Sequence, residues 1–276
     1  MTKEIMRKII VLVVLAIMIF PFFWIISSSF KSFKEIMTMD PSVFPKDPTT
    51  AHYHSLFSIR NPSKDFPANI MNSIIVGIST GIISIFISVL GAYSLARFPF
   101  KGSATFSKML LVVYVLPGIP LLLPIYDLLA RIRLVDTLPG LILVYTAINS
   151  PFAVWLLRSF FEAVPIELEE AARVDGASGL RAFYSITLPL CASGIVTAFM
   201  FVFVSTWGEY TLAQLIITEG AKKTVPLGLA TYMTDQYIEW GPLLAATTLI
   251  VVPVLIFFLP LSKYFISGLS AGALKE

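Results

Sequence analysis

The sequence has very few of the residues that build disulfides and metal centres. Only 13% of its 276 residues are charged, and it contains one cysteine and two histidines. The lone Cys191 excludes an internal disulfide and any cysteine-rich metal site. His52 and His54 form an isolated His-x-His, and two ligands are too few for a metal site, so we expect neither to bind metal.

Other chemical signatures are also missing. The sequence has no Walker A phosphate-binding pattern. The net charge is only +3, and the basic residues are scattered through short loops, which argues against nucleic acid as a partner. We therefore expect a chain that is not an enzyme and that binds no cofactor itself.

Long apolar runs dominate what remains. Hydrophobic residues make up 57% of the chain and the mean hydropathy is +0.83. About 20 apolar residues in a helix cross a bilayer, and the backbone of each span must form its hydrogen bonds internally. We predict an all-α membrane protein with six transmembrane helices in one domain, residues 1–276. The predicted spans are 9–27, 70–96, 109–129, 138–161, 191–217 and 242–265.

The first span resembles a secretory signal peptide because Lys3, Arg7 and Lys8 precede it. It lacks an Ala-x-Ala-like cleavage site and is followed closely by Lys31, so we expect it to be retained. Six spans place both termini on one side, and Lys and Arg counts only slightly favour the cytoplasm. The loop after the first span is long and proline-rich and is expected to form an ordered cap.

Prolines interrupt several spans, most densely Pro117, Pro120 and Pro124 in the third. Proline removes a backbone donor and kinks a helix. This cluster is compatible with ordinary packing or with a broken span that lines a pathway.

A polar loop at 162–189 contains "EEAARVDGASGL". Pro165 suits a first helical position. Glu167, Glu169 and Glu170 would lie in the first turns, where a negative charge interacts favourably with the positive end of the helix dipole. Gly176 is placed to end this helix in a left-handed conformation, and Ser178 can cap a second one. The pattern predicts a helix–turn–helix elbow on the membrane surface, either a docking surface or a solvated loop.

The spacing E-A-A-x3-G-x9-I-x-L-P is met from Glu170 to Pro189. It resembles the signature loop of permease subunits of binding-protein-dependent ABC importers, and the C-terminal "GLSAGALKE" is similar to the tail of maltose-type (MalG-like) permeases. This resemblance implies the type I importer permease fold, with the loop as a cytoplasmic EAA coupling elbow. Its ATPase-coupling residues would be Glu170, Ala171, Ala172, Asp175, Gly176 and Ala177.

The same resemblance implies the partners. They are a second homologous (MalF-like) permease, a cytoplasmic ATPase dimer that holds the ATP and Mg, an extracytoplasmic sugar-binding protein contacting the loop 219–240, and membrane lipid. The chain would sit in the cytoplasmic membrane with both termini cytoplasmic and import a sugar, favoured as a maltose/trehalose-type di- or oligosaccharide. The tail residues expected to reach the ATPase are Gly268, Leu269, Gly272 and Lys275.

Polar residues that could face the sugar are few. Asn149 lies midway along the fourth span, where an interhelical hydrogen bond is the alternative role. Trp207, Glu209 and Tyr210 resemble the family's W-N-[DE] stretch, although Gly208 replaces the asparagine; the two aromatics could equally belong to an interfacial belt. We expect Glu209 and Asp127 near the outer boundary without evident partners, and the second permease to supply most of the sugar site.

Two other classes remain as alternatives. A secondary transporter working alone would need coupling-ion groups near the membrane midplane, and an intramembrane enzyme would need paired catalytic groups at one depth. Neither set is evident in the sequence.

Overall fold

The computed structural model describes residues 2–58, 64–115, 118–234 and 236–273, with side chains placed as far as Leu261. Apart from one isolated β-bridge between Met233 and Ile238, the regular structure in these segments is helical. The long helices are α1 (Thr2–Ser29), α4 (Phe66–Arg97), α7 (Leu138–Ala163) and α14 (Trp240–Ala273). Each has a segment long and apolar enough to cross a membrane.

Two further helix pairs are bent, and each is long and apolar enough to span a membrane only if the pair is counted as one span. The axes of α5 (Ser103–Val115) and the segment Ile119–Arg131, which contains α6 (Leu122–Arg131), differ by 86°, so the third span is broken, one of the two outcomes expected from its prolines. Gly179–Leu190 and α11 (Ala192–Trp207) meet at 71°. With each bent pair counted as one span, the described chain has up to six.

The predicted limits of the fifth span were wrong at their C-terminal end. α11 ends at Trp207, and a separate short helix, α12 (Thr211–Ile216), follows. Glu209 accepts hydrogen bonds from the backbone N–H groups of Leu212 and Ala213, at 2.9 and 3.1 Å. A carboxylate that satisfies the free N–H groups of a new helix favours ending the old one, although the apolar pattern continues.

Helix α4 is the centre of the bundle, packing against α7 and α11. One face of α4 carries small residues that let neighbours approach closely. A Cβ atom on Gly81 would lie 2.5 Å from the Phe199 ring, and one on Gly77 would lie 2.9 Å from the Phe203 ring. Both rings belong to α11, so these glycines set its distance from α4.

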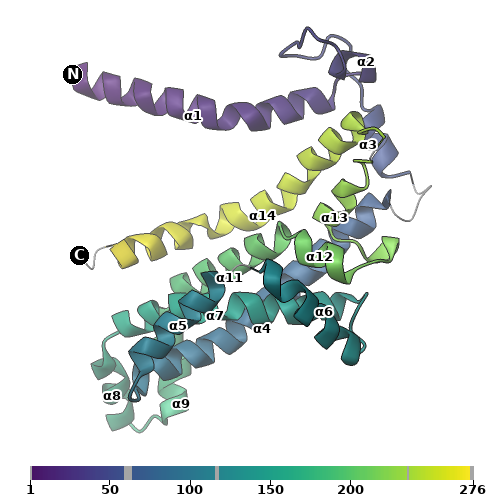
Figure 1. Cartoon of the computed structure of the whole chain (residues 1–276). Coiled ribbons are helices and arrows are strands. Elements are labelled where there is room, and N and C mark those ends of the chain that lie inside the picture. The colour runs from purple at the N-terminus through teal and green to yellow at the C-terminus, as the bar shows by residue number, and fades with distance from the viewer. Residues whose placement is uncertain (1, 59–63, 116–117, 235, 274–276) are drawn as a thin grey trace.

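The two ends of the bundle carry different short helices (Figure 1). At one end lie α2 (Phe33–Ile36), α3 (Ala51–Leu56), η4 (Gly220–Lys222) and α13 (Val225–Ala230); at the other lie α8 (Ile166–Val174) and α9 (Gly179–Ala182). In the described part of the loop after α1, residues 30–58 and 64–65, the short helices α2 and α3 form, as expected of an ordered cap, and His52 bonds the carbonyl oxygen of Lys31 at 3.0 Å. α1 approaches α14 at this end and diverges from it toward the termini (Figure 1).

Candidate functional site

The elbow has the predicted helix–turn–helix geometry. Gly176 adopts φ +89°, and the N–H of Ala177 donates to the carbonyl of Ala172 at 2.9 Å, which closes the end of α8. The Ser178 hydroxyl caps α9 by accepting the N–H of Arg181. One detail was wrong: Pro165 precedes the helix, which begins at Ile166.

Glu169 lies in the first turn of α8, as expected, but its side chain is buried against the bundle. Its side chain is only 2% exposed and forms an ion pair with Arg97 of α4, at 2.7 Å. The Thr187 and Tyr93 hydroxyls donate to the same carboxylate at 2.7 and 2.8 Å. Arg97 also donates to the carbonyl of Val164 at 2.9 Å. This buried network joins the elbow to α4.

The network keeps Glu169 charged. Burial alone would raise the pKa of Glu169, but the hydrogen bonds from Thr187, Arg97 and Tyr93 outweigh it, so the pKa lies below its usual value. Sequence reasoning missed the role of Glu169, although Arg97 at the same end of the bundle could have suggested a partner.

The adjoining face of α8 is open. Glu170, Ala171, Asp175 and Gly176 are exposed, and Ala172 is half-buried, as is Ala177 beyond the turn. The surface thus combines a carboxylate with small side chains over which another chain could approach closely. The structure brings these six predicted residues together in one elbow.

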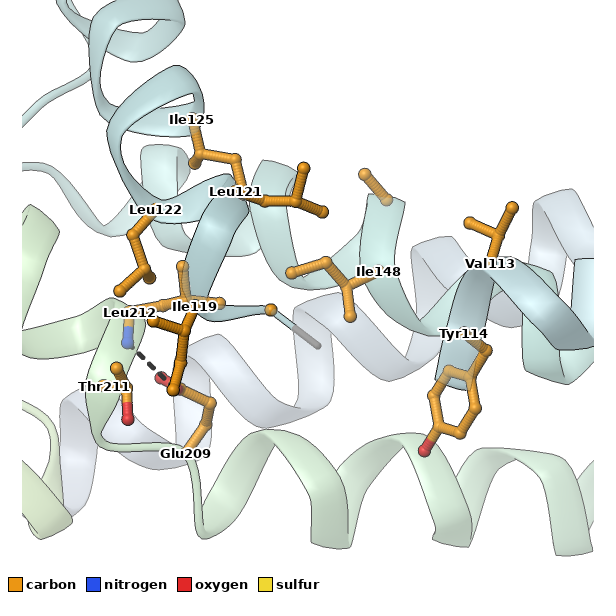
Figure 2. Close-up of a pocket in the computed structure, with 12 residues that line it drawn as sticks. Val113, Tyr114, Ile119, Leu121, Leu122, Ile125, Ile148, Glu209, Thr211 and Leu212 are labelled. Atoms are coloured by element: carbon orange, nitrogen blue, oxygen red, sulfur yellow. Dashed lines mark hydrogen bonds between the residues drawn. The ribbon is translucent and has the colours of Figure 1, made fainter. Parts of the chain in front are cut away.

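The second candidate region is a cavity of about 380 Å³ where α5, α6, α7 and α12 meet (Figure 2). Glu209 reaches it from below Ile119, while Tyr114 lies at its far side (Figure 2). Its lining is mainly aliphatic, and the polar side chains among the lining residues are Tyr114, Glu209 and Thr211.

Of the four predicted pathway residues, Glu209 lines the cavity, whereas Asn149, Trp207 and Tyr210 are not among its lining residues. Glu209 is not without partners, because the Tyr145 hydroxyl donates to it at 2.6 Å in addition to its bonds to α12. Asn149 is buried and donates to the carbonyl of Tyr145 at 2.8 Å, a bond within α7 that is neither a sugar contact nor the interhelical bond given as its alternative role. Trp207 is buried and stacks on Phe203, so it is not a belt aromatic, whereas Tyr210 is exposed.

Asp127 also has a partner, an exposed ion pair with Arg131 at 2.9 Å. The tail continues as helix α14 through Gly268, Leu269 and Gly272, and Lys275 lies outside the described residues. The sequence "GISTG" at 77–81 fits the Gly-x-Ser-x-Gly pattern of hydrolases. It lies inside α4, whereas that motif requires a strand-to-helix turn.

The segment 218–230 lies at the end of the bundle opposite the elbow (Figure 1), and for that position alone it is called the outer segment below. It is tied to the bundle by polar contacts that the sequence did not suggest. Asp136 accepts the N–H groups of Thr218 and Glu219 at 2.9 and 3.0 Å. Asn72 of α4 donates to the carbonyls of Ala221 and Lys223 at 2.9 and 3.0 Å. These contacts hold the outer segment across α4 and the start of α7.

Comparison with known proteins supplies the family. A family model described as binding-protein-dependent transport system inner membrane component matches residues 84–270. The inner membrane ABC transporter permease protein YcjP of Escherichia coli is 34% identical over 95% of this chain and 92% of its own length. The trehalose/maltose transport system permease protein MalG of Thermococcus litoralis is 32% identical over 100% of this chain and 99% of its own. The diacetylchitobiose uptake system permease protein DasC of Streptomyces coelicolor is 34% identical over 94% and 92%.

Solved structures show the same fold. A chain of a bacterial ABC transporter involved in import of the acidic polysaccharide alginate superposes with a TM-score of 0.80, at 21% identity and 96% coverage of both chains. A chain of an alginate transporter in complex with its pentasaccharide-bound periplasmic protein has a TM-score of 0.65 at 14% identity. The chain therefore belongs to the family of inner-membrane components of binding-protein-dependent transport systems, the permeases of ABC importers.

Proposed function

We propose that this chain is a permease subunit of an ATP-driven sugar importer and that α8 and α9 form its docking site for a cytoplasmic ATPase. The single observation that carries this proposal is the elbow: its frame is held by the buried Glu169 network, while Glu170 and Ala171 beside it stay exposed. A fixed frame with a free carboxylate suits docking against a partner that must push on the membrane helices.

The orientation of the chain in the membrane follows from that role. If the elbow meets a cytoplasmic ATPase, both termini are cytoplasmic and the outer segment faces the other side of the membrane. There the outer segment would contact a sugar-loaded binding protein. ATP and Mg would be bound by the ATPase and not by this chain, and a second permease would complete the pathway.

The substrate class is supported by the relatives. Permeases named for trehalose/maltose and diacetylchitobiose align along nearly the whole chain, and we favour a maltose/trehalose-type di- or oligosaccharide. The cavity beside Glu209 is the candidate stretch of the pathway in this subunit. Since its lining is mainly aliphatic, the second permease would supply most of the groups that bind sugar hydroxyls.

The docking role is tested by reversing one exposed charge. In this proposal Glu170 pairs with a basic residue of the ATPase. Glu170→Lys should therefore strongly reduce co-purification of the ATPase with the permease pair, because losing one partner of a desolvated charge pair costs about 2–5 kcal/mol, roughly thirtyfold or more in affinity. Glu167→Lys is the matched control, since Glu167 is also exposed on α8 but lies outside the signature. Equal ATPase recovery with both variants would refute docking through Glu170.

The transport role requires the assembled importer. Proteoliposomes containing both permeases and the ATPase should take up labelled trehalose only with internal ATP and external binding protein. Uptake by this chain alone without ATP would contradict the importer assignment. A panel of sugars on the binding protein then tests the substrate class, and stimulation by a different glycoside alone would refute the maltose/trehalose preference.

A further inference from the structure

The two ends of α4 are each tied by side-chain hydrogen bonds to a segment far away in sequence. At one end, Tyr93 and Arg97 bond Glu169 of the elbow, which lies 72 residues beyond Arg97. At the other, Asn72 bonds the carbonyls of Ala221 and Lys223, about 150 residues away. Figure 1 shows α4 running from the end with α13 to the end with α8 and α9.

The inner tie is buried and multivalent. Arg97 is 7% exposed and Glu169 is 2% exposed, and the Glu169 carboxylate also accepts the hydroxyl hydrogen of Thr187. A buried ion pair loses much of its stability when one partner is withdrawn, because the other charge is left without compensation. The elbow therefore cannot move away from α4 without breaking this set of bonds together.

The outer tie is equally close. The N–H of Val225 donates to the hydroxyl of Ser73 at 2.7 Å, and both groups are buried. Asn69, one turn earlier, lies so close to Gly228 that a Cβ atom there would overlap its side-chain amide. α13 and the residues before it thus rest directly on α4.

Between its two ties α4 runs as one continuous helix without an interior proline. Its 32 residues make about 48 Å of helix at 1.5 Å per residue. α1, α7 and α14 contain interior prolines, whereas the proline of α4, Pro67, lies in its first turn. Proline is a usual cause of sharp helix kinks, and close packing of Gly77 and Gly81 against α11 leaves little room for bending.

We propose that α4 is a rigid rod that couples the elbow to the outer segment, with Arg97 and Glu169 as its inner joint and Asn72 and Ser73 as its outer joint. This inference rests on the proposed ATPase docking and assigns positioning residues that do not touch the ATPase or the sugar. Movement of the elbow would be passed to the surface that meets the binding protein, and docking there would be passed back, since coupling between two sites is reciprocal.

The direct test measures the distance between the two ends. Nitroxide labels are placed on Tyr184→Cys in the elbow and Ala221→Cys in the outer segment, both exposed positions; buried Cys191 should not take the label. Electron–electron resonance is recorded on the assembled importer in nanodiscs, without nucleotide and with Mg-ATP and vanadate. The expected result is one unchanged distance in both states for the otherwise native chain, and a changed or broadened distance in the vanadate state for Glu169→Gln.

Tyr93→Phe provides a milder variant that removes one hydroxyl and leaves the ion pair, and it should give an intermediate broadening. A wild-type distance that changes with vanadate would overturn the rod, as would a folded Glu169→Gln chain that behaves like wild type. Failure of the ATPase to co-purify with the wild-type permease pair would instead refute the proposed docking, and this inference with it.

A second measurement tests whether the two joints act in one connection. The ratio of ATPase rates with and without sugar-loaded binding protein should fall at least about fivefold for Asn72→Ala and for Tyr93→Phe. The double variant should lose less than the product of the two single losses, because both changes weaken one and the same connection. Asp127→Asn and Gln214→Ala, at exposed positions off α4, should keep the wild-type ratio. If the loss of the ratio in the double variant equals the product of the two single losses, the joints act independently and the proposal is overturned.

Discussion

Glu169→Gln should strongly destabilise the permease fold. The substitution keeps the shape of the side chain but removes its charge, which leaves Arg97 buried at 7% exposure without an ionised partner. Breaking a buried ion pair in this way costs about 3–5 kcal/mol. At about 2–4 °C per kcal/mol for a chain somewhat smaller than this one, the midpoint of thermal unfolding should fall by about 6–20 °C.

Two variants calibrate this value. Tyr93→Phe removes one hydrogen bond to the Glu169 carboxylate, and bonds to charged groups contribute about 1.5–3 kcal/mol. Glu162→Gln breaks a more exposed ion pair with Arg158, which should cost at most about 1 kcal/mol. Thermal unfolding of the purified chain in one detergent should therefore rank Glu169→Gln as least stable, then Tyr93→Phe, then Glu162→Gln.

The pH dependence supplies the refuting result. The pKa of Glu169 lies below its unfolded value, so its contribution is fully present above the ordinary carboxyl range and is lost as pH falls through the folded pKa. The stability difference between wild type and Glu169→Gln should be largest near neutral pH and shrink in acid. A difference that does not depend on pH, or a Glu169→Gln chain more stable than Tyr93→Phe, would show that the ion pair is not what holds the elbow.

Three further predictions concern single positions. Gly176→Ala should cost about 1–2 kcal/mol because its φ of +89° disfavours a side chain, and it should weaken ATPase co-purification; Gly102→Ala, with φ +96°, should cost as much in thermal unfolding without changing ATPase binding. Gly81→Ala should lose about 1–3 kcal/mol by overlap with a phenylalanine ring of α11. A Cβ atom on Gly91 would lie 3.4 Å from its nearest neighbour, an ordinary contact distance, so Gly91→Ala should lose no stability in the same assay. In Asp136, partial burial alone would raise the pKa, but bonds from the outer segment lower it. As pH falls through this pKa, the protection factors of the amides of residues 218–223 (intrinsic exchange rate divided by observed rate) should fall, and Asp136→Asn should abolish that dependence.

The membrane spans could be predicted from sequence because the bilayer imposes one requirement on every span, a long apolar helix. The family resemblance likewise depended on a short motif, E-A-A-x3-G-x9-I-x-L-P, whose residues have local roles in a helix–turn–helix. Gly176 and Ser178 occupy the positions that a left-handed helix end and a new helix start require. These features are local, so the sequence reveals them without the fold.

What sequence reasoning missed depends on partners that are distant in the chain. The end of α11 at Trp207 lies within an apolar stretch, so hydropathy does not reveal it. The helix end depends on the bonds of Glu209 to α12 and Tyr145. Nothing in the local sequence singles out Asn72, because its acceptors lie about 150 residues away. Hydropathy detects burial in lipid, whereas these contacts are set by which helices become neighbours.

The pair Glu169 and Glu170 shows why adjacent identical residues can have different roles. Successive residues of an α-helix point about 100° apart, so when one faces the bundle the next faces sideways. Glu169 bonds α4 and also Thr187, beyond the turn and α9, so it closes the two arms of the elbow onto each other as well as onto the membrane helices. Because that anchoring uses Glu169, the Glu170 carboxylate is left exposed on the surface of a braced frame. A force applied by a partner at Glu170 is therefore transmitted through Glu169 to α4 and is not taken up by the bending of a loop.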